Sequence, residues 1–116
     1  MVNMNDGEKL QYLFQTLGDI NRLKIIKFID KNEHSVSDIV DATNLSQPLV
    51  SHHLRILRER EILKTKRNGP FIYHKLKDPR LLDAIGLFLE ILNSMKGIKK
   101  QDPMFFCPPF WKNWTK

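Results

Sequence analysis

Hydrophobic residues recur at helical spacing through the first part of the chain. Residues 8–17 place four apolar side chains on one face of a predicted helix: Leu10, Leu13, Phe14 and Leu17. A second helix is predicted from Asp19, a good N-cap, because apolar residues continue on one face as far as Ile29. A short helix over about 37–42 follows, so the pattern predicts three helices before Thr43.

A tight turn and a capped helix are predicted next. Thr43-Asn44-Leu45 is the turn, Ser46 is the N-cap, and Pro48 lies in the first helical turn, where its missing N–H costs nothing. The helix is predicted to continue to about Arg60, with these residues facing inward: Leu49, Val50, His53, Leu54 and Leu57. The outward face is predicted to carry Gln47, Ser51, Arg55 and Arg58, with His52 beside them.

The pattern then changes to strands and one last helix. Short strands are predicted over 62–66 and 71–76, because Asn68-Gly69 between two such runs is a strong hairpin signal. Asp78 and Pro79 are predicted as the N-cap and first residue of a helix that ends near residue 95. This helix is apolar almost all round, so its second face is predicted to contact another subunit.

Composition narrows the class of protein. At 116 residues the chain is predicted to form one small globular domain over 1–100 and a tail over 101–116. A chain of this size buries about 65% of its unfolded surface, so a dimer partner would stabilise it. The single cysteine excludes a disulfide framework, and no apolar run is long enough to cross a membrane. The polar, acidic N-terminus does not resemble a signal peptide, so a cytoplasmic protein with no membrane contact is expected.

The net charge of +6 is concentrated in one segment. Residues 1–50 carry a net charge of −2 and residues 78–116 carry +2. Residues 51–77 carry +6, from eight Lys and Arg against two Glu: Arg55, Arg58, Arg60, Lys64, Lys66, Arg67, Lys75 and Lys77 against Glu59 and Glu61. A local excess of this kind predicts a phosphate-binding face.

Two helices joined by a tight turn and followed by a basic hairpin predict a winged helix-turn-helix. The fold class is therefore mainly α with a small β-hairpin wing, and the expected partner is double-stranded DNA. Glutamine can pair with adenine, serine can bond a base or a phosphate, and arginine can bond guanine or a phosphate.

Three segments resemble the ArsR family of bacterial and archaeal repressors. They are LGDINRLKI at 17–25, VSHHLRILR at 50–58 and NGPFIYHKL at 68–76, within a match that covers roughly residues 8–96. The resemblance implies a homodimeric winged-helix repressor that dimerises through its terminal helices and releases its operator when an effector binds. Glu61 stands where the family usually has glycine; if this position needs φ > 0, Glu costs about 1 kcal/mol there.

Roles for the candidate DNA-binding residues follow from their chemistry and from the resemblance. The resemblance places three residues on base-reading positions: Gln47, Ser51 and His52. Phosphate contacts are expected from Arg55, Arg58, Lys66 and Arg67, with Asn68 at the tip of the wing.

The residues of the family's metal sites are not expected to bind metal here. Ser35 and Ser37 stand where the family motif has Cys-Val-Cys, and neutral hydroxyls are poor ligands for soft ions. On the last helix Asp78 is retained, but the matching positions are Arg80, Ile91 and Ser94. We therefore predict no metal and no cofactor.

The four histidines do not change this expectation. His52 and His53 point about 100° apart on a helix and cannot chelate one ion together. His53 is predicted to be a hydrogen-bonded packing residue, and His74 a satisfied core residue on the same strand face as Ile72 and Leu76. His34 is predicted to be solvated.

The C-terminal tail holds five of the eleven aromatic residues within positions 105–114. Pro108 and Pro109 prevent a continuous helix there. The expected arrangement is that the tail folds back over the dimer helices or the partner subunit. A pocket for an apolar effector and a docking site for a partner protein are the open alternatives, and Cys107 is expected to be an inert thiol rather than an oxidation sensor.

Two other classes of function stay open. The domain could be a winged-helix protein-interaction module, whose basic face binds an acidic protein, or a sequence-indifferent, chromatin-type DNA binder. An enzyme is not expected, because the sequence has no Gly-rich phosphate loop, no supported Cys–His pair and no carboxylate pair in an apolar setting.

Overall fold

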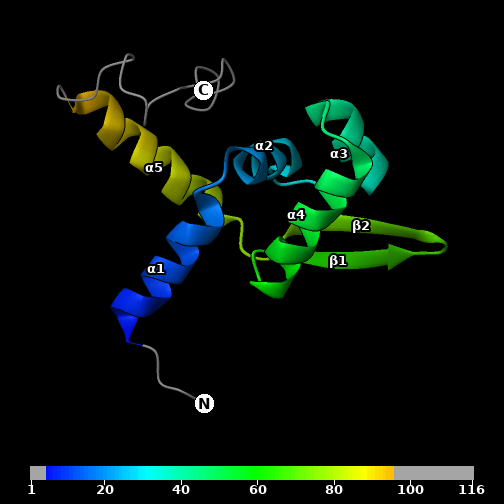
Figure 1. Ribbon diagram of the computed structural model, residues 1–116, viewed down its shortest axis with the longest axis horizontal. Helices are drawn as coiled ribbons and strands as arrows, with labels where there is room; N and C mark the ends of the chain where they lie inside the picture. The colour runs from blue at the N-terminus through cyan, green and yellow to red at the C-terminus, as the bar shows by residue number, and fades with distance from the viewer. Residues whose placement is uncertain (1–4, 96–116) are drawn as a thin grey trace. The chain divides into compact units, whose positions relative to one another are not determined.

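A computed structural model describes residues 5–95 (Figure 1). The chain divides into two compact units, one ending at Lys77 and one beginning at Asp78. The first unit contains α1 (Asp6–Leu17), α2 (Ile20–Ile29), α3 (Val36–Thr43), α4 (Gln47–Glu59), β1 (Leu63–Asn68) and β2 (Phe71–Leu76). The second contains α5 (Arg80–Ser94). The winged helix-turn-helix predicted from the sequence is confirmed.

Polar side chains at the N-caps determine where the helices of the first unit begin. Asp19 accepts hydrogen bonds from two backbone N–H groups of α2, and the Ser46 side chain accepts from Leu49 N, so both predicted caps are confirmed. Ser35 caps α3 in a reciprocal capping box with Asp38. Helix α3 therefore begins at Val36, one residue before the predicted start.

The core of the first unit lies among α2, α3 and α4, which contact one another in pairs. Its fully buried apolar side chains are Ile25, Ile26, Ile29, Ile39, Val50, Leu54 and Leu57. Asn44, between α3 and α4, has left-handed backbone angles (φ 59°, ψ 18°), which asparagine tolerates better than most residues. The turn and the core together hold α4 with its opposite face in solvent.

The hairpin turn differs from the predicted Asn-Gly turn. Asn68 is the last residue of β1 and pairs with Phe71, so the two-residue loop is Gly69-Pro70. Gly69 has φ +63° and proline holds φ near −65°, the sign pattern of a type II′ turn. An Asn-Gly loop would put Pro70 into the strand ladder, where it has no N–H to donate. Strand β1 consequently runs to Asn68, past the predicted end at Lys66.

Strand β2 has neighbours on both edges. One edge pairs with β1, and the other makes a two-bond bridge between His74 and His34, at N···O distances of 2.7 and 3.0 Å. Leu63 and Leu76 are opposite each other and buried at the base of the hairpin, whereas the rest of β1 is exposed. The wing therefore projects from the core as a largely solvent-exposed ribbon (Figure 1).

Helix α5 begins one residue later than predicted. Pro79 is the N-cap rather than the first helical residue, and Asp78 Oδ1 accepts a hydrogen bond from Arg80 N at 3.0 Å. Ile85 and Leu89 are buried, whereas four large apolar side chains are about half exposed: Leu87, Phe88, Ile91 and Met95. None of the helices described is long and apolar enough to cross a membrane. Cys107 and the aromatic tail lie outside the described residues.

Candidate nucleic-acid interface

The outward face of α4 carries the polar residues that the helical periodicity places there. Gln47, Ser51 and Arg55 follow one another at four-residue steps, and all three are exposed, as is His52. Arg55 Nε is 3.6 Å from Glu59 Oε1, and both side chains are about two-thirds exposed. An ion pair this exposed contributes little, so the guanidinium can exchange its partner for a phosphate.

Arg58 differs from its predicted outward position. It is half-buried, and its Nη1 donates to His74 Nε2 at 3.1 Å. The reason is that the C-terminal part of α4 packs against β1, which brings the wing next to the last helical turn. Arg58 therefore connects the helix that carries the polar face to the strand that forms the wing.

The two wing residues from which phosphate contacts are expected lie on opposite faces of the hairpin. Lys66 and Arg67 are consecutive in β1, and successive side chains of a strand point to opposite sides. Both are exposed, and Lys66 Nζ is 3.5 Å from Glu33 Oε1. We call the face opposite the buried Leu63 and Leu76 the outer wing face; by register it carries Lys64, Lys66, Asn68, Phe71, Tyr73 and Lys75.

His53 is buried on the inward face of α4, and its predicted packing role is confirmed. Arg22 Nη1 donates to His53 Nδ1 at 3.4 Å, and Asp19 Oδ1 is 4.0 Å from Nε2. Burial lowers the pKa of His53, while the Asp19 carboxylate opposes that shift and Arg22 adds to it. His53 therefore favours the neutral form and is not available for DNA.

His74 is buried but not fully satisfied, in contrast to the prediction. Nε2 accepts from Arg58, so the ring proton is assigned to Nδ1, which has no hydrogen-bond partner in the described part of the chain. Burial, followed by the charge of Arg58, lowers its pKa. Ile72, predicted to share its apolar surroundings, is 48% exposed because the core ends before the tip of the wing.

His34 is not the solvated residue that was predicted. It is half-buried, and its ring packs on Phe28 with centroids 4.3 Å apart. Its Nδ1 is 3.6 Å from Asp38 Oδ2. The connector before α3 is thus held by the bridge to β2 and by these two side-chain contacts, which no local sequence pattern reveals.

Two arginine contacts to Thr16, one of them long-range, were not predicted from the sequence. Arg22 Nε donates to Thr16 O at 2.6 Å, and Arg60 Nη1 donates to Thr16 Oγ1 at 2.8 Å. The Arg60 guanidinium also lies 4.6 Å from the centroid of the Tyr12 ring. Arg60 was counted only as part of the basic excess, because the contact joins residues 44 positions apart. These contacts join the end of α1 to α2 and α4.

Glu61 has the backbone conformation that its position suggested. Its φ is +61°, in the left-handed region that favours glycine. Lys77 Nζ donates to Glu61 Oε1 at 2.8 Å, and this hydrogen bond lowers the pKa of the carboxyl. The side chain thus gains an exposed ion pair at a strained position between α4 and β1.

The positions of the family's two metal sites hold residues with other contacts. Ser35 Oγ accepts from Asp38 N at 3.2 Å as part of the α3 cap. The Asp78 carboxylate binds the Arg80 guanidinium at 2.7–3.1 Å, which lowers the Asp78 pKa to about 2. Within residues 5–95, no group of three or more His, Cys, Asp or Glu side chains could hold a metal ion.

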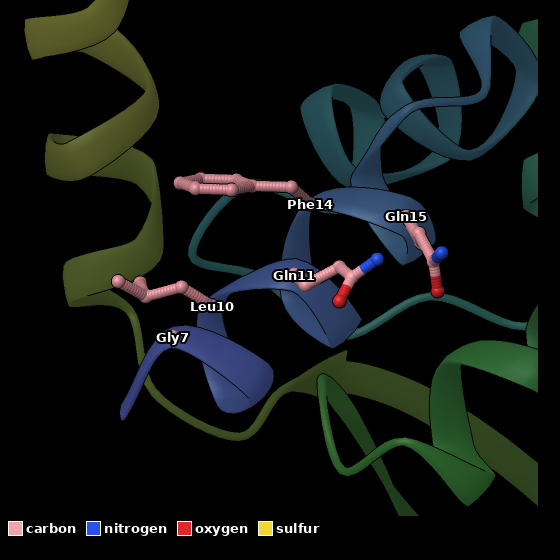
Figure 2. A pocket seen from close by; sticks show the side chains of 5 residues that line it. All are labelled: Gly7, Leu10, Gln11, Phe14 and Gln15. Atoms are coloured by element: carbon pink, nitrogen blue, oxygen red, sulfur yellow. The ribbon is translucent and has the colours of Figure 1, made fainter. Parts of the chain in front are cut away.

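Helix α1 presents an apolar face with a pocket along it (Figure 2). Gly7, Leu10, Gln11, Phe14 and Gln15 line the pocket at three- and four-residue spacing. Figure 2 shows Leu10 and Phe14 extending to the same side of the helix. Leu10 and Phe14 are each about half exposed, which leaves α1 with apolar surface suited to a further contact.

Comparison with known proteins places this geometry among transcriptional regulators. Residues 19–65, from the cap of α2 into β1, match the family described as bacterial regulatory protein, arsR family. The transcriptional repressor SdpR of Bacillus subtilis (strain 168) is 35% identical over 82 residues, which cover 71% of this chain and 91% of SdpR. The arsenical resistance operon repressor of Staphylococcus xylosus is 30% identical over 87 residues, covering 75% and 83% of the two chains.

A solved structure shares the fold. It is the homodimeric winged helix-turn-helix DNA-binding domain of Mb0332 from Mycobacterium bovis, described as a possible ArsR-family transcriptional regulator. The TM-score is 0.67 at 18% identity, and the match covers 80% of this chain and 91% of that chain.

Proposed function

The chain belongs to the ArsR family of bacterial regulatory proteins, and from this premise we propose a homodimeric repressor that binds an inverted-repeat operator and responds to a signal other than a metal ion. The family consists of transcriptional regulators with a DNA-binding winged helix-turn-helix, not enzymes. The observation that carries the proposal is the exposed polar face of α4 next to a basic hairpin. Such a protein acts on DNA in the cytoplasm, the compartment that the sequence predicts.

Base reading is assigned to the exposed N-terminal half of α4. Gln47, Ser51 and His52 are exposed and offer hydrogen-bond donors and acceptors. The helix width fits the major groove of B-DNA. A glutamine amide pairs bidentately with adenine, so Gln47 is expected to give the strongest preference at one position of each half-site.

Phosphate contacts are assigned to the surrounding cations. Arg55, Lys66 and Arg67 are exposed. Arg55 pairs with Glu59 and Lys66 with Glu33, and because both cations are largely exposed, a phosphate can replace either carboxylate. Arg58 stays in this set because its hydrogen bond to His74 comes from Nη1, and the guanidinium has five N–H donors in all. Asn68 ends β1 beside the turn, where it can reach the DNA backbone.

Dimerisation is assigned to the two terminal helices. Both α1 and α5 present half-exposed apolar side chains, and the sequence predicted that α5 contacts another subunit. The Mb0332 domain is homodimeric, which supports the same assembly here. A two-fold dimer places its recognition helices about 34 Å apart, and this separation requires an inverted-repeat operator.

The proposal of a signal other than a metal ion is supported by the residues at the positions of the family's two metal sites. Ser35 is committed to a helix cap, and Asp78 is committed to Arg80. The tail over 101–116 lies outside the described residues, so its contact with the dimer helices or the partner subunit, and the alternatives of an apolar effector or a partner protein, stay predictions.

Selection of bound sequences from random duplexes tests the proposal most directly. The expected result is an enriched motif with two-fold symmetry. Gln47→Ala should relax the preference at one position of each half-site, whereas Arg67→Ala should weaken all sequences alike. The log of the affinity should fall with log salt with a slope near −6, for about three or four phosphates per subunit. Equal behaviour of the two variants would contradict the assigned roles.

The same measurements separate the other two classes of function. No retardation of any duplex at low salt would favour a protein-interaction module with an acidic partner. Equal affinity for the enriched motif and for random DNA at matched salt would favour a sequence-indifferent binder.

A further inference from the structure

The outer wing face ends in an exposed aromatic side chain. Phe71 is 60% exposed, the largest exposed fraction among the large apolar residues of the described chain. Asn68 lies directly opposite it across the strands, and the Tyr73 ring lies 6.4 Å away at an angle of 42°. The wing tip thus presents an apolar ring to solvent, supported by Tyr73 on the same face.

Phe71 belongs to a regular part of the hairpin. The ladder between β1 and β2 extends to the Asn68–Phe71 pair, and the loop beyond it has only two residues. Gly69 supplies the positive φ of that loop, and the ring of Pro70 restricts its own φ. The backbone of Phe71 is therefore placed by strand pairing, which reduces the entropy lost when its side chain binds a partner.

The cations on the same face point to an anionic partner. Lys64 and Lys75 are directly opposite each other across the strands, an arrangement that destabilises a sheet when no anion lies nearby. Lys66 stands opposite Tyr73, between this lysine pair and the tip, and its exposed ion pair with Glu33 can be exchanged for a phosphate. A strip of cations that ends in an apolar ring matches a groove whose edges are phosphates and whose interior presents sugar and base surfaces.

We propose that Phe71 is a minor-groove wedge: it inserts against a base step at the outer flank of each half-site while lysines of the same face contact the adjoining phosphates. Apolar side chains in this position partly unstack a step, and pyrimidine–purine steps such as TA and CA yield most easily. The wing thereby selects deformable flanks without hydrogen bonds to bases. This inference rests on the proposed function and adds a second source of specificity to that of Gln47.

The test uses the full chain and the duplex enriched from random DNA, with either a TA step or a GC step at the outer flank. The wild-type protein is expected to bind the TA duplex about tenfold more tightly. Phe71→Ala should reduce this preference to about twofold or less. Ile72→Ala is the matched control, because Ile72 is adjacent and 48% exposed but lies on the opposite wing face, and it should keep the preference.

A second measurement reports on the step itself. With 2-aminopurine at the flanking step, unstacking by the wild-type protein should raise the fluorescence, and Phe71→Ala should abolish the rise. Unchanged circular dichroism establishes that each variant is folded. A flank preference that survives Phe71→Ala, or that Ile72→Ala removes equally, overturns the wedge.

The outcomes distinguish the wedge from the function on which it rests. If Gln47→Ala changes the preference inside the half-site and Phe71→Ala changes nothing at the flank, the wedge is wrong and the repressor proposal stands. If no duplex is enriched or bound, both proposals are wrong.

Discussion

Helix α4 is held on two sides by an arginine–histidine contact, and the two contacts differ in how well their polar groups are satisfied. On the α2 side, Arg22 donates to His53; on the wing side, Arg58 donates to His74. Both histidines are buried, and burial lowers the pKa of each. Helix α4 therefore contributes the histidine to one Arg–His pair and the arginine to the other, and the two pairs have different surroundings.

The α2 side is a more complete network. Arg22 also donates to Thr16 O at 2.6 Å, and the Asp19 carboxylate lies 4.0 Å from both Arg22 and His53. On the wing side, His74 faces the charge of Arg58, no carboxylate of the described residues forms an ion pair with it, and its Nδ1 has no hydrogen-bond partner among them. The neighbours, rather than the pair itself, decide how much such a contact stabilises the fold.

Removal of each arginine should give the largest difference between the two sides. Arg22→Met is expected to lower the free energy of unfolding by about 3 kcal/mol, because it leaves the Thr16 carbonyl and His53 unpaired in a part-buried site. Arg58→Met is expected to cost about 1 kcal/mol, because only one hydrogen bond is lost. Urea unfolding at one fixed protein concentration measures both values. Equal losses of unfolding free energy in the two variants would contradict the proposed difference between the two sides of α4.

The pH dependence of stability sharpens the same comparison. A buried histidine whose pKa is lowered stays neutral in the fold while the unfolded chain binds a proton below the ordinary value of 6.5. Stability should therefore be complete above that value and decrease as the pH falls below it. His74→Leu should flatten this dependence more than His53→Leu, because Asp19 partly offsets the shift of His53.

Unfolding midpoints of the three proteins between about pH 5 and pH 8 measure this effect. If His74→Leu leaves the pH dependence of stability unchanged, protonation of His74 is not its cause.

The smallest expected effect concerns the strained residue on the wing side. Glu61→Gly should raise the free energy of unfolding by about 0.5–1 kcal/mol, because glycine adopts φ > 0 without a Cβ penalty and the lost ion pair with Lys77 is exposed. Glu61→Ala keeps the Cβ and loses the ion pair, so it should give no gain. Thermal unfolding of both variants measures the difference, and an equal gain from alanine would exclude backbone strain as the cause.

Features that depend on residues close to one another in the sequence could be predicted from it. Asp19 and Ser46 begin their helices as expected, since a cap needs only a side chain near the N–H groups of the next turn. The outward positions of Gln47, Ser51 and Arg55 follow from helical periodicity alone. The family pattern pointed to Glu61 as a position that could need φ > 0, and its φ is +61°. The DNA-binding roles of these residues stay predictions.

Other features required the packed chain. The hairpin loop moved to Gly69-Pro70 because a strand ladder needs an N–H that proline lacks. Arg58 turned toward His74, and Arg60 toward Thr16, because tertiary packing brings together residues 16 and 44 positions apart. The sequence by itself determined the helices, the caps at Asp19 and Ser46 and the outward positions of Gln47, Ser51 and Arg55, since these depend on contacts within one or two turns. Only the tertiary structure decided which cations stay in solvent and which histidine keeps an unpaired nitrogen, because both depend on which distant groups the core brings within reach.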